Sequence, residues 1–137
     1  MQKKNATPDK LSRTERKDLD IEIGFIEGVV KRDPGFVEAL LVLGDDYTRR
    51  GKYAEGLRVD LRLAKARPAD PGVHYNLACS YALTDQMERA VQALNTALDL
   101  GYRDFKWLRR DPDLKPLRQH PLYRKLRAKI RALSEKS

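Results

Sequence analysis

Cysteine is nearly absent from the sequence: Cys79 is the only one among 137 residues. A single thiol can form neither an internal disulfide bond nor a cysteine-based zinc site. This usage is typical of a reducing compartment, so we expect a cytoplasmic protein.

Long apolar runs are also lacking. No stretch approaches the roughly 20 apolar residues that a membrane-spanning helix needs. The basic start of the chain, MQKKNATPDKLSRTERKD, has no apolar segment after it, so we expect neither a secretory signal nor a membrane span. Charge is abundant instead: 35% of the residues are charged and the formal net charge is +8, which favours acidic partners.

The patterns of enzyme chemistry are missing as well. There is no Gly-rich phosphate loop, no pair of carboxylates in an apolar setting and no cluster with metal-ligand spacing. The segment VHYNLACSYA holds His74, Asn76 and Cys79, residue types that can form a nucleophilic site. His74 and Cys79 are five residues apart on one expected helix, however, which places them roughly 140° apart around its axis. We therefore expect no enzyme, no cofactor and no metal site.

The chain does contain an internal repeat of 34 residues. A shift by this length superposes residues of the same size class, as a repeated packing unit requires. The matched pairs are Pro34 with Pro68, Leu43 with Leu77, Gly44 with Ala78, Tyr47 with Tyr81, Gly56 with Ala90, and Leu57 with Val91.

Each unit is predicted to be a pair of helices. Apolar residues recur with a period close to 3.6 residues. The segments with this period are 36–50 and 53–66 in the first unit, and 73–83 and 87–100 in the second. Gly51 ends the first helix because glycine takes the left-handed conformation without a side-chain penalty. Pro68 ends the second helix because proline disfavours helical geometry in the residue before it.

These units resemble the tetratricopeptide repeat, whose helical hairpins have the same period. That family places a bulky residue, Leu-Gly or Leu-Ala, and Tyr on the first helix, then small residues on the second helix and a closing proline. The matching residues are Leu40, Leu43, Gly44, Tyr47, Gly56 and Pro68 in the first unit, and His74, Leu77, Ala78, Tyr81, Ala90 and Ala97 in the second. The resemblance implies an all-α fold, an α-solenoid of antiparallel helical hairpins in a right-handed superhelical stack.

We expect one helical repeat domain at 13–133, between a flexible basic tail (1–12) and a short tail (134–137). Its parts are an N-terminal capping helix (13–32), repeat 1 (37–68), repeat 2 (71–101) and a degenerate C-terminal cap (105–133). Ser12 and Glu15 have the spacing of a capping box at the start of the first helix.

In the resembled family, the first helices of successive units line a concave groove that holds a partner peptide. The resemblance therefore implies a protein-binding adaptor or scaffold, whose partner the sequence does not identify. The implied groove residues are Leu41, Val42, Asp45 and Arg49 in repeat 1, Tyr75, Asn76, Cys79 and Leu83 in repeat 2, and Lys106 and Arg110 in the cap. Asn76 can hydrogen-bond a peptide backbone, because an amide both donates and accepts; alternatively, it bonds only within its own scaffold. The sequence does not decide whether the groove is accessible or is occupied by the protein's own termini.

Some members of the family grip a carboxylate with two lysines, two asparagines and an arginine. Asn76, Lys106 and Arg110 match three of these positions by register. Leu41 and Asp45 stand at the other two, and Asp45 would repel a carboxylate. The full clamp is therefore absent, and the groove favours a partly apolar peptide or a helix.

Asp60 departs from the repeat pattern, because the family places a large apolar residue there. Either a small rotation of the helix exposes Asp60 and Leu61 packs in its place, or Asp60 is buried and held by an arginine or a tyrosine hydroxyl. A buried charge needs such a partner.

The C-terminal helix offers an alternative function. From Arg118 to Ser137 there are seven basic residues and one acid, Glu135, which gives a net charge of seven minus one, or +6. Such a stripe can bind nucleic acid or an anionic surface, or it can be a solvated outer side that stops further stacking. Homodimerisation through an exposed edge of the short array is a further alternative.

Overall fold

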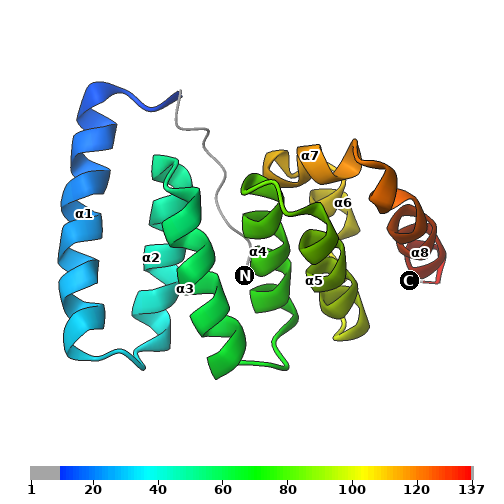
Figure 1. Ribbon diagram of the computed structural model, residues 1–137, viewed down its shortest axis with the longest axis horizontal. Coiled ribbons are helices and arrows are strands. Elements are labelled where there is room, and N and C mark those ends of the chain that lie inside the picture. Colours follow the sequence, from blue (N-terminus) through cyan, green and yellow to red (C-terminus); the bar gives the residue numbers. More distant parts are fainter. Residues whose placement is uncertain (1–9, 137) are drawn as a thin grey trace.

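The computed structural model describes residues 10–136, and every regular element within them is helical. Successive helices pack as antiparallel pairs in a row from α1 to α8 (Figure 1). The five long helices at the start are α1 (Arg13–Arg32), α2 (Val37–Arg50), α3 (Tyr53–Ala66), α4 (Pro71–Leu83) and α5 (Met87–Asp99). They are followed by α6 (Phe105–Leu108), the 3-10 helix η2 (Pro112–Leu114), α7 (Lys115–Arg118), the 3-10 helix η3 (Pro121–Tyr123) and α8 (Arg124–Glu135). The expected all-α stack of antiparallel hairpins is confirmed.

Helix α1 begins at the capping box expected from the sequence. The Ser12 hydroxyl accepts from the Glu15 backbone N–H at 3.0 Å, and the Glu15 carboxylate accepts from the Ser12 N–H at 3.3 Å. Residues 1–9 of the expected tail lie outside the described residues. Leu11, which the sequence assigns to that tail, is instead buried in the core between α1, α2 and α3. The ordered domain therefore starts before residue 13.

The outer side of α1 is unusual for its exposed apolar residues. Ile21 is 63% exposed and Phe25 is 67% exposed. Charged residues surround them along the helix, and no helix of the described part is both long and apolar enough to cross a membrane. This side has the character of a packing surface, and the homodimer expected through an array edge stays a prediction.

Close approach between α2 and α3 depends on two glycines. A Cβ atom on Gly44 would lie 3.2 Å from Asp60 Oδ1 and 3.3 Å from Val59 Cγ1. A Cβ atom on Gly56 would lie 3.3 Å from Thr48 Oγ1. The small residues of the repeat pattern therefore let the two helix backbones meet.

Asp60 is buried at the contact between the two hairpins. It is 2% exposed and accepts a hydrogen bond from the Ser80 hydroxyl on α4. The alternative in which Leu61 replaces it in the core is wrong, because Leu61 is 42% exposed. The alternative of a buried and partnered aspartate is confirmed, although the partner found is a serine and not an arginine or a tyrosine.

Helix α4 starts with a well-formed cap. The Asp70 carboxylate accepts from the N–H groups of Gly72 at 2.9 Å and Val73 at 3.3 Å. Pro71 occupies the first helical position, where its missing N–H costs nothing. This cap fixes where α4 begins, and therefore which of its side chains face the C-terminal segment.

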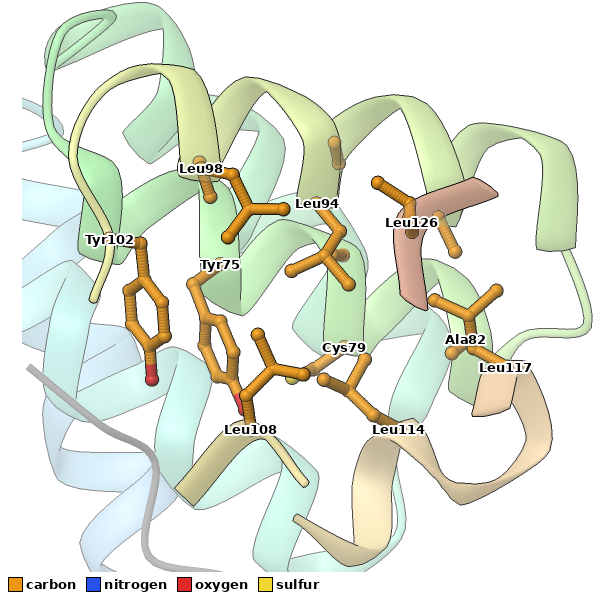
Figure 2. Close-up of a cluster of buried hydrophobic side chains, with 14 of the residues drawn as sticks. Tyr75, Cys79, Ala82, Leu94, Leu98, Tyr102, Leu108, Leu114, Leu117 and Leu126 are labelled. Carbon is orange, nitrogen blue, oxygen red and sulfur yellow. The ribbon is translucent and has the colours of Figure 1, made fainter. Parts of the chain in front are cut away.

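The second half of the chain has its own apolar core, formed by α4, α5 and the segment from α6 to α8. Figure 2 shows Leu108 and Leu114 of the C-terminal segment beside Tyr75 and Cys79 of α4. Helix α8 continues through Glu135, two residues beyond the expected end of the cap. The short tail predicted from residue 134 is therefore helical at its start.

A matched pair of glycine substitutions tests the close approach. Gly44→Ala should lower the free energy of unfolding by about 1–3 kcal/mol, because Val59 and the hydrogen-bonded Asp60 leave little room to relax. At Gly24 on α1, an added Cβ atom would have no other atom within 4 Å. Gly24→Ala should therefore raise the free energy of unfolding by up to about 1 kcal/mol. Urea unfolding of both variants measures the difference. Equal effects of the two substitutions would contradict the assigned contact.

Candidate functional site

The groove positions predicted on α2 lie on one side of that helix and remain accessible. Val42 is 41% exposed, and Leu41, Asp45 and Arg49 are half-buried. The spacing of Leu41, Asp45 and Arg49 by four residues places them in one row along the helix. We call these four residues the α2 surface. It combines apolar area with one charge of each sign.

The groove positions predicted on α4 have a different environment. Tyr75 and Cys79 are 0% exposed, Asn76 is 6% exposed and Leu83 is half-buried. Tyr75 and Cys79 point into the C-terminal core (Figure 2). The expectation that these two side chains line an accessible groove is therefore corrected, because the protein's own C-terminal segment covers them.

Asp111 holds that segment against α4. Its Oδ2 accepts a hydrogen bond from the Tyr75 hydroxyl at 2.6 Å and a weaker one from Cys79 Sγ at 3.6 Å. Its Oδ1 accepts from the Asp113 backbone N–H at 3.0 Å, which caps η2. Asp111 is itself 0% exposed. A buried carboxylate thus has hydrogen-bond donors on both oxygens, as burial of a charge requires.

The electrostatics keep Tyr75 in its donor form. Burial raises the pKa of the Tyr75 hydroxyl far above its usual range, and the neighbouring Cys79 and Asp111 raise the pKa further. The ring of Tyr75 stacks on Tyr102, with centroids 4.2 Å apart and planes 8° from parallel. The phenol is therefore protonated at any physiological pH and positioned to donate to Asp111.

Sequence reasoning missed Asp111. The signal available was the run RDPDL, in which an aspartate directly precedes a proline, as at a helix N-cap followed by Pro at the first position. That pattern predicts the local cap but not the bond to Tyr75, which lies 36 residues earlier in the chain.

Cys79, Asp111 and Asp113 form the one group in the described residues with the ligand types and spacing of a metal site. One ligand atom from each lies within 4.8 Å of the others, and all three residues are buried. Hydrogen bonds from Tyr75 and Cys79 to Asp111 link these residues across α4 and the C-terminal segment.

The remaining predicted residues are spread over the surface. Lys106 and Arg110 are exposed on the C-terminal segment, whereas Asn76, which together with them matches part of the clamp pattern, is buried. The Asn76 carbonyl oxygen has no hydrogen-bond partner among residues 10–136. His74 donates from Nε2 to the Pro68 carbonyl at 2.8 Å and so closes the loop before α4. Asn76, Lys106 and Arg110 therefore do not present their side chains together, in agreement with the absence of a full clamp in the sequence.

A carboxyl pair lies at the contact of α1 with α2, beside the α2 surface. Asp46 is 2% exposed, and Arg49 Nη1 lies 4.0 Å from its Oδ1. Burial and, after it, the nearby Glu22 carboxyl of α1 raise the pKa of Asp46 from 3.8 to about 8, although Arg49 lowers it. Asp46 therefore carries a proton at neutral pH.

Fold and site together define a helical-hairpin repeat protein whose second hairpin is covered by the chain's own C-terminal segment. No protein-family model matches the chain. The chain is similar to a protein of Arabidopsis thaliana whose name describes it as chloroplastic, with 42% identity over 79 residues. The match covers 56% of this chain and only 24% of that protein, so the chain spans about a quarter of its relative. The relative's name places that protein in a chloroplast, and the cytoplasmic setting of this chain stays a prediction.

A double-mutant cycle tests the Asp111 network. Asp111→Ala leaves the buried Tyr75 hydroxyl without its acceptor and should cost about 2–4 kcal/mol of stability. Tyr75→Phe should cost about 1.5–3 kcal/mol, the range for a hydrogen bond to a charged group. Urea unfolding of the double variant should show a loss smaller than the sum of the two. Simple additivity would contradict a direct bond between the two side chains.

Asp46 predicts a specific pH dependence. Between pH 3.8 and about 8 the folded protein holds a proton on Asp46 that the unfolded chain has released, so stability falls as pH rises through this window. Asp46→Asn removes this proton uptake. From pH 5 to pH 7 the stability of the variant relative to the wild type should therefore rise by on the order of 3 kcal/mol, at about 1.4 kcal/mol per pH unit. Urea unfolding at several pH values measures it, and parallel curves for the two proteins would contradict the raised pKa.

Proposed function

We propose that this protein is a non-catalytic protein-binding module of the tetratricopeptide-repeat type. In this proposal a partly apolar partner segment binds on the α2 surface. Support comes from the 34-residue period of the sequence and from the helical hairpins that coincide with it. The main support for the proposal is that the chain's own C-terminal segment binds the equivalent side of α4.

The corresponding side of α4 binds a segment of the chain itself. This segment is short, interrupted by prolines and only partly helical. It places Leu108 and Leu114 against Tyr75 and Cys79 (Figure 2) and adds a polar bond through Asp111. The chemistry of this contact, leucine side chains plus one hydrogen-bonded acid, is a guide to what the adjoining repeat accepts.

The α2 surface offers similar chemistry, and within residues 10–136 no segment buries Val42 as the C-terminal segment buries Tyr75. Val42 is 41% exposed, and Leu41 adds apolar area beside it. Arg49 can receive an acidic group of a partner, although Asp46 and Asp45 lie near it on the same helix. A segment with an apolar anchor and a nearby acid would complement this surface.

The non-catalytic part of the proposal rests on the two most reactive side chains. The His74 ring nitrogen is hydrogen-bonded to a backbone carbonyl, and Cys79 is buried against Asp111. His74 and Cys79 therefore have different hydrogen-bond partners and do not contact each other through these bonds.

Peptide selection with a matched control tests the binding surface. The full chain is presented to a random-peptide library, and selected peptides are titrated calorimetrically against wild type, Val42→Asp and Leu61→Asp. Val42 and Leu61 are almost equally exposed, at 41% and 42%, but Leu61 lies on α3, outside the predicted groove. We expect Val42→Asp to weaken binding by about tenfold or more, or roughly 1.4 kcal/mol, and Leu61→Asp to leave it unchanged.

Two outcomes would contradict the proposal. The library could yield no peptide that binds the folded wild type, or the selected peptides could bind both variants as well as the wild type. Thermal unfolding of each variant distinguishes a lost contact from a lost fold.

A further inference from the structure

Four arginines surround one small cavity at the C-terminal end of the stack. Arg109 follows α6, Arg118 ends α7, and Arg127 and Arg131 lie one turn apart on α8. Together with Tyr123 and Ile130 they line a recess of about 230 Å³. We call this recess the arginine pocket. It lies away from the α2 surface and does not depend on the proposed function.

Bonds to the backbone hold the guanidinium groups of Arg118 and Arg127 in place. Arg118 Nη1 donates to the carbonyls of Leu108 at 2.9 Å and Asp111 at 2.8 Å. Arg127 Nη2 donates to the Arg118 carbonyl at 3.1 Å, and its guanidinium lies 5.3 Å from the centre of the Tyr123 ring. These bonds use only a few of the five N–H donors on each guanidinium. The remaining donors are available to a ligand without a large ordering cost.

Among the described residues, no ion pair offsets the positive charge of the pocket. Within residues 10–136, none of the four arginines forms an ion pair with a carboxylate, although Lys129 on the same helix pairs with Asp99 at 2.6 Å. Arg109 instead donates to the Ser134 hydroxyl at 3.0 Å. Four like charges around one recess repel each other, and an anion placed between them would relieve that repulsion.

We propose that the arginine pocket binds a phosphate monoester. The planar fork of a guanidinium matches the oxygens of a phosphoryl group in a bidentate manner. Several arginines also suit its charge of about −1.5 to −2 at neutral pH. The recess is smaller than the roughly 300–1,000 Å³ of typical small-molecule pockets, which fits a phosphoryl group and the first atoms of its ester. The source of the group is a free phosphorylated metabolite or a phosphorylated side chain of a partner.

Nucleic acid and membrane surfaces fit the pocket less well. Recognition of single strands relies on aromatic rings that stack on bases, but the Tyr123 ring is 3% exposed and Arg127 lies over it. A helix that lies on a membrane needs an exposed apolar side, but Leu126 and Ile130 of α8 are buried in the core. A compact anion in the recess is therefore favoured over an extended one along the helix.

The test compares two double variants with the same change in charge. Arg109→Gln/Arg131→Gln removes two arginines from the rim of the pocket, and Arg124→Gln/Lys125→Gln removes two exposed charges of α8 outside it. Inorganic phosphate is titrated at constant ionic strength while the ¹H–¹⁵N spectrum of the full chain is recorded. We expect saturable shifts in the wild type at Arg118, Tyr123 and Arg127. The affinity should fall by about tenfold or more in the pocket variant, which loses two charge-assisted partners, and by less than about twofold in the control.

Further arms of the experiment identify the source of the phosphoryl group. A phosphoserine peptide that binds more tightly than inorganic phosphate, while its serine counterpart does not bind, would assign a phosphorylated partner. Equal affinity for the phosphoserine peptide and inorganic phosphate would assign a small metabolite. The proposal is overturned if phosphate does not saturate the wild type. It is also overturned if both double variants weaken together, or if a single-stranded oligonucleotide or anionic vesicles compete and depend equally on both pairs. Unfolding midpoints confirm that both variants are folded.

Discussion

The hydrogen bond from Tyr75 to Asp111 is the contact on which the second half of the structure depends. It joins residues 36 positions apart, and both partners are 0% exposed. A buried carboxylate without this donor would be costly, so the segment from α6 to α7 is held in one place. Because the segment is held there, Leu108 and Leu114 complete the core and the arginines beyond it converge on one recess. The same bond removes Tyr75 and Cys79 from the surface and leaves the α2 surface as the accessible part of the predicted groove.

Small residues impose the other main constraint. Gly44 and Gly56 bring α2 and α3 so close that the neighbouring Asp60 is enclosed, and its carboxyl group accepts a hydrogen bond from Ser80 across the next helix boundary. A larger apolar residue at position 60 would fill the space but would remove this polar link. The departure of Asp60 from the repeat pattern is therefore a consequence of how the two hairpins meet.

Local features of the fold could be predicted from the sequence because their causes are local. The capping box at Ser12, the left-handed turn at Gly51 and the helical period of each segment involve residues within a few positions of one another. The accessibility of Tyr75 and Cys79 could not be predicted, because it depends on an irregular segment beyond residue 105. A segment interrupted by prolines has no regular hydrophobic periodicity from which its packing side could be predicted. In the sequence, the residues of the arginine pocket are visible only as part of a basic stripe. The pocket itself could not be predicted, because it forms only when α6, α7 and α8 pack against one another.

The link from Asp60 to Ser80 also bears on how the stack comes apart. In repeat proteins, stability is approximately the sum of terms for each unit and for each interface between neighbours. The hydrogen bond from Ser80 to Asp60 crosses the α3–α4 boundary, so separating the hairpins would break this bond together with the apolar contacts beside it. We therefore expect the two hairpins to unfold together rather than one after the other.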